Sequence, residues 1–225
     1  MHEGHRTRLK ERFLRDGLDN FEKHEVLEIL LYYVIPRKNT NDIAHRLLDA
    51  FGSLSSVFDA PIEALSKIEG VGRNSATLIK LLPELSRRYL DDKYNSQSKI
   101  ITNEIAGQIF VNKFIGRINE HVILMLLDSK RKLLFCGVVS EGTVNAADIY
   151  VKKIVELALR YNASTAIVSH NHPSGIAMPS KEDILTTIEI KKTLDFVNIK
   201  LIDHIIVADN DYVSLADSKL EDLIF

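Results

Sequence analysis

Cysteine is almost absent from this chain, and so are the long apolar runs that would commit it to a membrane. The single thiol, Cys136, excludes an internal disulfide and favours a reducing compartment. Because it lies between Phe135 and Gly137 in an apolar stretch, we expect it to fill space in a core. Even the apolar run Val122–Leu127 is far too short to cross a bilayer, which takes about 20 residues. The sequence therefore predicts no membrane partner.

A strong net charge is missing too. The formal net charge of −2 provides no overall attraction to nucleic acid, so any nucleic-acid surface must be local. The start, MHEGHRTRLKERF, has no apolar signal-peptide core, and together with the single cysteine this predicts a cytoplasmic protein. What the chain does have is ordinary globular composition, with 45% apolar and 27% charged residues. Its 225 residues suffice for one or two domains with a buried core.

The first part of the chain has the periodicity of helices. Apolar residues recur at helical spacing in four segments, and Pro36 and Gly52 follow the first two as helix-ending residues. The predicted helices cover residues 21–35, 39–51, 61–68 and 73–90. The polar segment Asp91–Lys99 has no apolar pattern and predicts a linker. The predicted division is an all-α domain, a linker and a second domain, at residues 1–94, 95–99 and 100–225.

The second part of the chain changes to the pattern of strands. Short β-branched runs bounded by polar residues or glycine predict strands at residues 121–128, 132–142, 164–172, 198–208 and within 209–217. Two helices are predicted among them, at residues 146–162 and 180–196. Strands mixed with flanking helices predict an α/β sandwich around a central mixed sheet. The expected fold class is therefore α+β overall, with an all-α first domain.

One stretch, SHNHPSGIAMPSKED, gathers residues that can hold a metal ion. It follows a buried-looking strand, and residues two apart on a strand share a face, so His170 and His172 can point the same way. Pro179 and Ser180 predict a helix start, and Asp183 in its first turn could return as a third ligand. Two imidazoles and a carboxylate suit one zinc ion per chain and leave a fourth position open for water.

Each part of this stretch also has an ordinary structural interpretation. A lone His-x-His on a strand is commonly a surface or core feature. Ser180 with Asp183 three residues later is close to a capping box, which needs no metal. Because these residues occur together at the end of an apolar strand, the metal-site interpretation is favoured over the separate structural interpretations. A catalytic zinc would still need a general base.

The stretch HNHPSGIAMPSKED resembles the JAMM metalloprotease motif, and its Pro-Ser-Gly and Pro-Ser elements resemble the RadC branch of that superfamily. The resemblance implies a cytidine-deaminase-like JAMM/MPN domain with zinc held by His170, His172 and Asp183. It implies that Ser180 helps to stabilise the oxyanion of the reaction. The segment 4–54 resembles the amino-terminal region of RadC-type proteins, so the likeness covers nearly the whole chain.

The resemblance also implies a catalytic glutamate just before a strand upstream of the histidines. Glu120 precedes the apolar run that starts at Val122, whereas the alternative, Glu141, lies at the end of another predicted strand. Either carboxylate could instead be a solvated strand end. The pair Asp203 and His204 resembles a recurrent RadC pattern, which makes His204 a candidate for orienting a metal ligand; a half-buried structural histidine is the alternative.

The segment LSKIEGVGRNSATLIKLL resembles a helix-hairpin-helix motif, near residues 61–90. Gly70 and Gly72 permit a tight turn, and the free N–H groups around Arg73 and Asn74 can bind a phosphate of a DNA backbone. A packing turn or a protein contact is the alternative, since residues 1–94 hold 15 basic and 15 acidic residues. An early basic cluster could add phosphate contacts or form a solvated helix face, and it consists of Arg6, Arg8, Lys10, Arg12 and Arg15.

Three functions are consistent with these features. The first is a zinc hydrolase that cleaves a peptide or isopeptide bond, with the helical domain localising it on DNA. The alternative is a DNA repair or recombination accessory protein of the RadC type, in which DNA binding dominates. A metal-dependent nuclease is less favoured, because nucleases more often use paired, oxygen-ligated metals. The substrate and the oligomeric state stay open at this stage.

Overall fold

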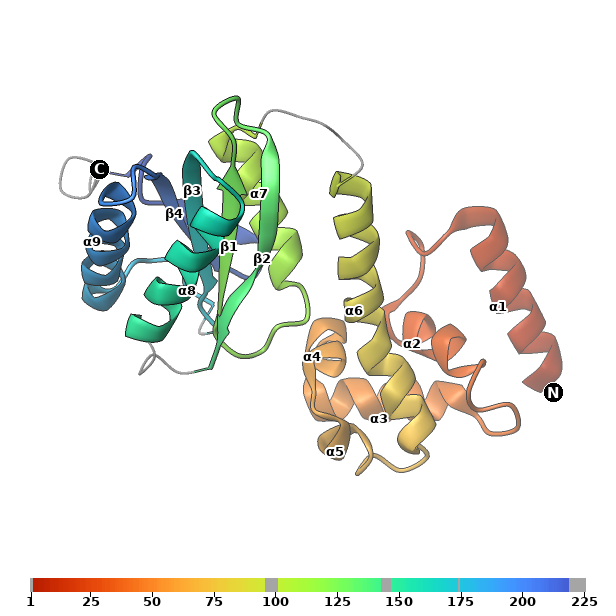
Figure 1. The fold of residues 1–225 in the computed structure, drawn as a ribbon. Coiled ribbons are helices and arrows are strands. Elements are labelled where there is room, and N and C mark those ends of the chain that lie inside the picture. The colour runs from red at the N-terminus through yellow and green to blue at the C-terminus, as the bar shows by residue number, and fades with distance from the viewer. Residues whose placement is uncertain (1, 96–100, 143–146, 174, 219–225) are drawn as a thin grey trace. The chain divides into compact units, whose positions relative to one another are not determined.

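The computed structural model describes residues 2–95, 101–142, 147–173 and 175–218 (Figure 1). Contacts divide the chain into two compact units, Met1–Leu85 and Ser86–Phe225. This division falls inside one helix, α6 (Arg73–Asn95). The linker prediction is therefore wrong for residues 91–95, which continue α6, and residues 96–99 lie outside the described part. The polar residues of this segment form helix because nothing in them breaks the periodic backbone hydrogen bonds.

The first unit is all-α, as predicted. Its helices before α6 are α1 (His2–Asp16), α2 (Lys23–Leu31), α3 (Thr40–Phe51), α4 (Leu54–Asp59) and α5 (Ile62–Leu65). The helix predicted over residues 39–51 is α3, and both of its predicted boundaries are confirmed. The Asn39 side chain accepts a hydrogen bond from the N–H of Asn41 at its start, and Gly52 follows its end with φ of +83°. The helix predicted over residues 61–68 has only four residues, and neither α1 nor α4 was among the predicted helices.

Helix α2 ends earlier than its apolar periodicity predicts. It was expected to reach residue 35 but stops at Leu31. The guanidinium of Arg6 donates to the carbonyl oxygens of Ile35, Pro36 and Lys38 at 2.7–2.9 Å. A contact from α1 therefore satisfies backbone acceptors beyond the end of α2, which no local pattern could reveal.

The second unit contains a five-stranded mixed sheet in the order β2-β1-β3-β4-β5. Its strands are β1 (His121–Leu127), β2 (Leu133–Glu141), β3 (Thr165–Asn171), β4 (Lys200–Ala208) and β5 (Asp211–Ser214). Only β3 and β4 pair in parallel; the other neighbours are antiparallel. All five strands agree with the predicted ones, and the predicted fold class is confirmed.

Helices cover both faces of this sheet (Figure 1). On one face, α8 (Ala147–Arg160) and α9 (Lys181–Asp195) pack against side chains that include Leu124 and Val168. On the other, α7 (Asn103–Phe114) packs against side chains that include Ile123 and Ile167. Helix α7 was not among the predicted helices. The layered packing leaves the polar ends of the strands as the place for a site.

The single cysteine and the shortness of the apolar segments both led to predictions about the fold. Cys136 on β2 is half-buried and packs on the side of the sheet covered by α7, which agrees in part with the predicted core role. Burial raises the pKa of its thiol to about 12. Among the helices described, none is both long and apolar enough to cross a membrane.

Candidate metal centre

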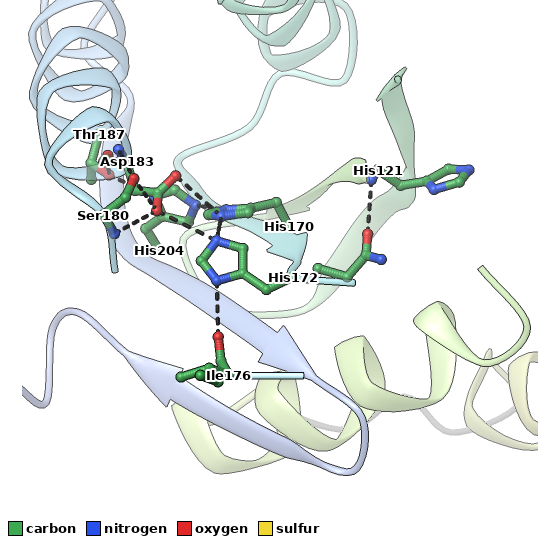
Figure 2. Close-up of polar contacts among 9 residues, drawn as sticks. His121, His170, His172, Ile176, Ser180, Asp183, Thr187 and His204 are labelled. Carbon is green, nitrogen blue, oxygen red and sulfur yellow. Dashed lines mark hydrogen bonds and ion pairs between the residues drawn. The ribbon is translucent and has the colours of Figure 1, made fainter. Parts of the chain in front are cut away.

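The two histidines reach the same side of the sheet because of strand alternation. Ala166, Val168 and His170 follow each other at two-residue spacing on β3, and the first two lie in the core beneath α8 and α9. His172 continues the strand direction, since its N–H donates to the carbonyl of Val207 at 2.8 Å. Both imidazoles therefore face the beginning of α9, which carries Asp183 (Figure 2).

The structure brings the three predicted ligands together. One ligand atom from each of His170, His172 and Asp183 lies within 4.8 Å of the others. The two Nε2 atoms are 2.9 Å apart, and Asp183 Oδ1 lies 3.2 Å from Nε2 of His170. The second oxygen, Oδ2, lies 3.5 Å from Nε2 of His172. His170 is almost fully buried, while His172 and Asp183 are half-buried.

The chain of hydrogen bonds behind His170 determines which nitrogen carries its proton. The Thr187 hydroxyl donates to the carbonyl of Asp183 at 2.5 Å, so its oxygen accepts from Nδ1–H of His204 at 2.6 Å. Nε2 of His204 is then an acceptor, and Nδ1–H of His170 donates to it at 2.8 Å. The lone pair of His170 Nε2 is therefore directed into the cluster.

His172 reaches the same state by a shorter route. Its Nδ1 lies 3.0 Å from the carbonyl oxygen of Ile176, which can only accept, so Nδ1 carries the proton. Both histidines thus present unprotonated Nε2 atoms to each other. Metal-binding histidines commonly donate their other N–H to such an acceptor, which orients the ring and selects the tautomer.

Asp183 serves the helix and the cluster with different oxygens. Its Oδ2 accepts from the N–H and the hydroxyl of Ser180, both at 2.7 Å, and the Ser180 hydroxyl oxygen accepts from the N–H of Asp183. The capping box considered from the sequence is therefore present, yet Oδ1 still faces His170. Burial alone would raise the pKa of Asp183, but the two hydrogen bonds that Oδ2 accepts from Ser180 favour the ionised carboxylate and lower that pKa.

The two candidate glutamates lie on opposite faces of the sheet edge. Glu120 immediately precedes β1, where Val122 pairs with His170, so alternation turns Glu120 toward the face that carries His170. Glu141 pairs across the sheet with His121 and its carboxylate lies 3.4 Å from Nε2 of that residue. Glu120 is half-buried and Glu141 exposed. Among the described residues, neither carboxylate belongs to the cluster of three ligands.

His204 lies where a residue that orients a ligand must lie. It is 3% exposed, and burial lowers its pKa to about 3. Sequence reasoning missed Thr187, although its position four residues after Asp183 places both on one side of α9. It also missed the carbonyl of Ile176, because a backbone acceptor leaves no residue-type signal.

The hairpin residues line a separate cavity in the first unit. Residues 34–38, 70 and 72–75 line an open cavity of about 720 Å³ at the surface. The lining holds three cationic side chains and no acidic one: Arg37, Lys38 and Arg73. Gly70 has φ of +92°, and a Cβ there would lie 2.7 Å from Ile43. Gly72, Arg73 and Asn74 are exposed at the start of α6. The structure therefore brings all four predicted hairpin residues to one cavity and adds Arg37 and Lys38.

The early basic cluster on α1 is largely occupied by contacts within the protein. Arg6 binds backbone carbonyls, Arg12 pairs with Glu25, and Arg15 pairs with Asp16. The Lys10 ammonium lies 5.1 Å from the ring centre of Tyr33. These contacts reduce the number of cations that α1 could offer to phosphates.

The mixed sheet, its three layers and the His-His-Asp cluster at the end of β3 define a protein of the JAB-domain class. Residues 100–220 match the family described as RadC-like JAB domain, and residues 3–77 match the one described as UPF0758 N-terminal. The UPF0758 protein FN0909 of Fusobacterium nucleatum subsp. nucleatum is 39% identical to this chain over 97% of each. The chain belongs to the RadC-like JAB domain family, which confirms the resemblance seen in its motifs.

Proposed function

We propose that this protein is a zinc-dependent hydrolase of peptide or isopeptide bonds, with one zinc ion per chain held by His170, His172 and Asp183. The observation that carries the proposal is the convergence of one ligand atom from each of the three residues, with a hydrogen-bond partner behind both histidine Nδ1 atoms. Two unprotonated Nε2 atoms 2.9 Å apart repel each other unless a cation shares their lone pairs. Two imidazole nitrogens and a carboxylate oxygen fit zinc and leave an open position, which is typical of a catalytic site.

Zinc held in this way supplies a water molecule whose pKa is lowered to about 7. The chain must accept a proton from that water and pass it to the leaving group. We assign this role to Glu120, because it faces the same side of the sheet as His170. The alternative, Glu141, is engaged with His121 on the other side. We assign to Ser180, which is exposed beside Asp183, the donation of a hydrogen bond to the oxyanion. In the structure its hydroxyl hydrogen is donated to Asp183 Oδ2, so this role requires the hydroxyl to rotate toward the substrate.

Metal analysis of the purified chain tests this proposal first. We expect about one zinc per wild-type chain and a loss of binding in His172→Ala, since the remaining two ligands are too few for a tight site. His45→Ala is the matched control, because His45 lies on α3 in the other unit. A wild-type protein that neither contains zinc nor binds added zinc would contradict the proposal.

Screening peptide and isopeptide libraries with the zinc-loaded chain then tests the reaction. Glu120→Gln should lower turnover about 10²- to 10⁴-fold while zinc content stays unchanged. Retained turnover in this variant, with loss in Glu141→Gln, would transfer the role to Glu141.

A second function, non-sequence-specific binding of a DNA backbone, is favoured by the cationic cavity at the hairpin. Arg37, Lys38 and Arg73 line it together with the start of α6, where free N–H groups favour an anion. If this function dominates and the zinc site is inactive, the protein is a DNA-associated accessory protein. The absence of acidic side chains from the lining is what supports phosphate as the ligand.

Salt titration of binding to a short DNA duplex tests this second function. Each phosphate contact that is lost should reduce the slope of log K against log salt by about 0.9. We therefore expect Arg73→Glu and Gly72→Asp to weaken binding and flatten the salt dependence. Lys132→Glu, at an exposed position in the other unit, is the control. Equal affinity of all four proteins would exclude the hairpin as the DNA site.

A further inference from the structure

Asn171 stands between the two candidate ligands in sequence but serves the opposite face of the sheet. It is the last residue of β3 and is only 6% exposed. Since side chains alternate along a strand, its amide points away from the face that carries His170. Asn171 is therefore not available as a ligand, and its burial calls for partners elsewhere.

Those partners are backbone groups on both sides of Glu120. The side-chain oxygen of Asn171 accepts from the N–H of His121 at 2.8 Å. Its amide nitrogen donates to the carbonyl of Asn119 at 3.0 Å and to that of Arg117 at 3.4 Å. The carbonyl of Glu120 itself accepts from the N–H of Gly142 at 2.9 Å. The backbone of this glutamate is thus fixed from β3 and from β2.

The sheet ladder alone does not fix this segment. Pairing between β1 and β3 begins at Val122, opposite His170, so the residues before Val122 have no ladder partner on β3. Asn171 replaces the missing ladder bonds with side-chain bonds. Because Asn171 lies between His170 and His172, these bonds tie the backbone around Glu120 to the same stretch of chain that carries both candidate ligands.

We propose that Asn171 is a positioning residue that sets the place of the Glu120 carboxylate relative to the metal ligands. This proposal rests on the proposed function, in which Glu120 is the general base. Productive geometry in such sites tolerates displacements of only about 0.5 Å, and a residue on a loop reaches that precision only through supporting hydrogen bonds.

Carbon NMR of the full-length chain labelled in its glutamate carboxyl groups tests the proposal without a substrate. The Glu120 signal is identified by its loss in Glu120→Gln, and one equivalent of zinc is then added. In the wild type we expect zinc to shift this signal. In Asn171→Ala we expect the shift to fall at least about twofold while zinc affinity stays within about threefold, because the ligands are untouched. Hydrogen exchange of residues 117–122 should become faster.

Ser169→Ala is the matched control, because Ser169 is the neighbouring buried residue on the same face and its hydroxyl has no partner among the described residues. It should leave the Glu120 signal and the exchange rates unchanged. Asn171→Asp, which keeps an oxygen acceptor for His121, provides a second variant should the alanine variant fail to fold, and its zinc-induced shift should lie between those of the wild type and of Asn171→Ala.

The outcomes separate this inference from the function on which it rests. An equal zinc-induced shift in the wild type and in both Asn171 variants overturns the positioning role and leaves the hydrolase proposal standing. A wild-type Glu120 signal that does not respond to bound zinc overturns the assignment of the base instead. Failure of the wild type to bind zinc overturns the proposed function, and the positioning role with it.

Discussion

At the scale of single residues, a buried histidine decides how the candidate centre presents its ligands. His204 is buried, and its lowered pKa keeps it neutral at physiological pH. One of its ring nitrogens therefore donates a hydrogen bond and the other accepts one. The Thr187 hydroxyl selects that pattern by accepting from Nδ1 of His204. In the neutral ring, Nε2 of His170 then carries the lone pair, so no change of tautomer is needed when a metal binds.

Replacing this hydroxyl should weaken zinc binding although Thr187 is not a ligand. Thr187→Val keeps the shape of the side chain but leaves Nδ1 of His204 without its acceptor, so the His170 tautomer is no longer selected. We expect zinc affinity to fall about 10- to 100-fold, measured by competition with a chromophoric chelator. Thr193→Val is the control, because the hydroxyl of Thr193 donates to the backbone carbonyl of Glu189 on the same helix and, within the described part of the chain, does not contact the cluster. Equal zinc affinity of the two variants would show that the hydrogen bonds from Thr187 through His204 to His170 do not affect metal binding.

At the scale of elements, helix α7 is held against the sheet by a contact without spare space. A Cβ on Gly107 would lie 2.4–2.9 Å from ring atoms of Tyr212 on β5. Gly107 therefore lets α7, the helix that covers one face of the sheet, approach β5 closely. The packing of α7 thus depends on the absence of a side chain.

Gly107→Ala should therefore destabilise the second unit in spite of the higher helix propensity of alanine. We expect a loss of about 1–3 kcal/mol in the free energy of unfolding, measured by denaturant titration, because the new methyl group forces the ring to move. In the Tyr212→Leu background the same substitution should cost much less, since the ring is gone. Additive effects of the two substitutions would contradict this contact.

At the scale of the whole molecule, the chain combines two units with separate cores and separate candidate sites. The cationic cavity belongs entirely to the first unit and the metal centre entirely to the second. Helix α6 contributes residues to both. Loss of one function should therefore leave the other measurable, which is why variants in each unit serve as controls for the other.

Alkylation of Cys136 should report unfolding of the second unit. With its thiol pKa raised to about 12, the native chain at pH 8 should react on the order of 10³-fold more slowly than an ordinary thiol. The unfolded chain releases this proton near its usual pKa, so stability should fall as the pH rises from about 9 toward 12. The rate of iodoacetamide labelling against denaturant concentration measures the first effect. Fast labelling of the native chain would contradict it.

The sequence by itself determined the elements with strong periodicity and the residue types of the candidate centre. All five strands were predictable from β-branched runs, and His170 and His172 from two-residue spacing at the end of one of them. These features are local, because side-chain alternation and capping act within a few residues. For the same reason Asp183 was predictable as both a cap and a candidate ligand.

Only the tertiary structure decided which protons and which backbone groups complete the centre. His204, Thr187 and Asn171 act through partners up to 54 residues away, and sequence spacing carries no information about such contacts. The same holds for Arg6, whose bonds to residues about 30 positions later lie beyond the end of α2. Buried polar groups must find partners wherever the packed chain brings them, so their pairing is settled by the fold as a whole.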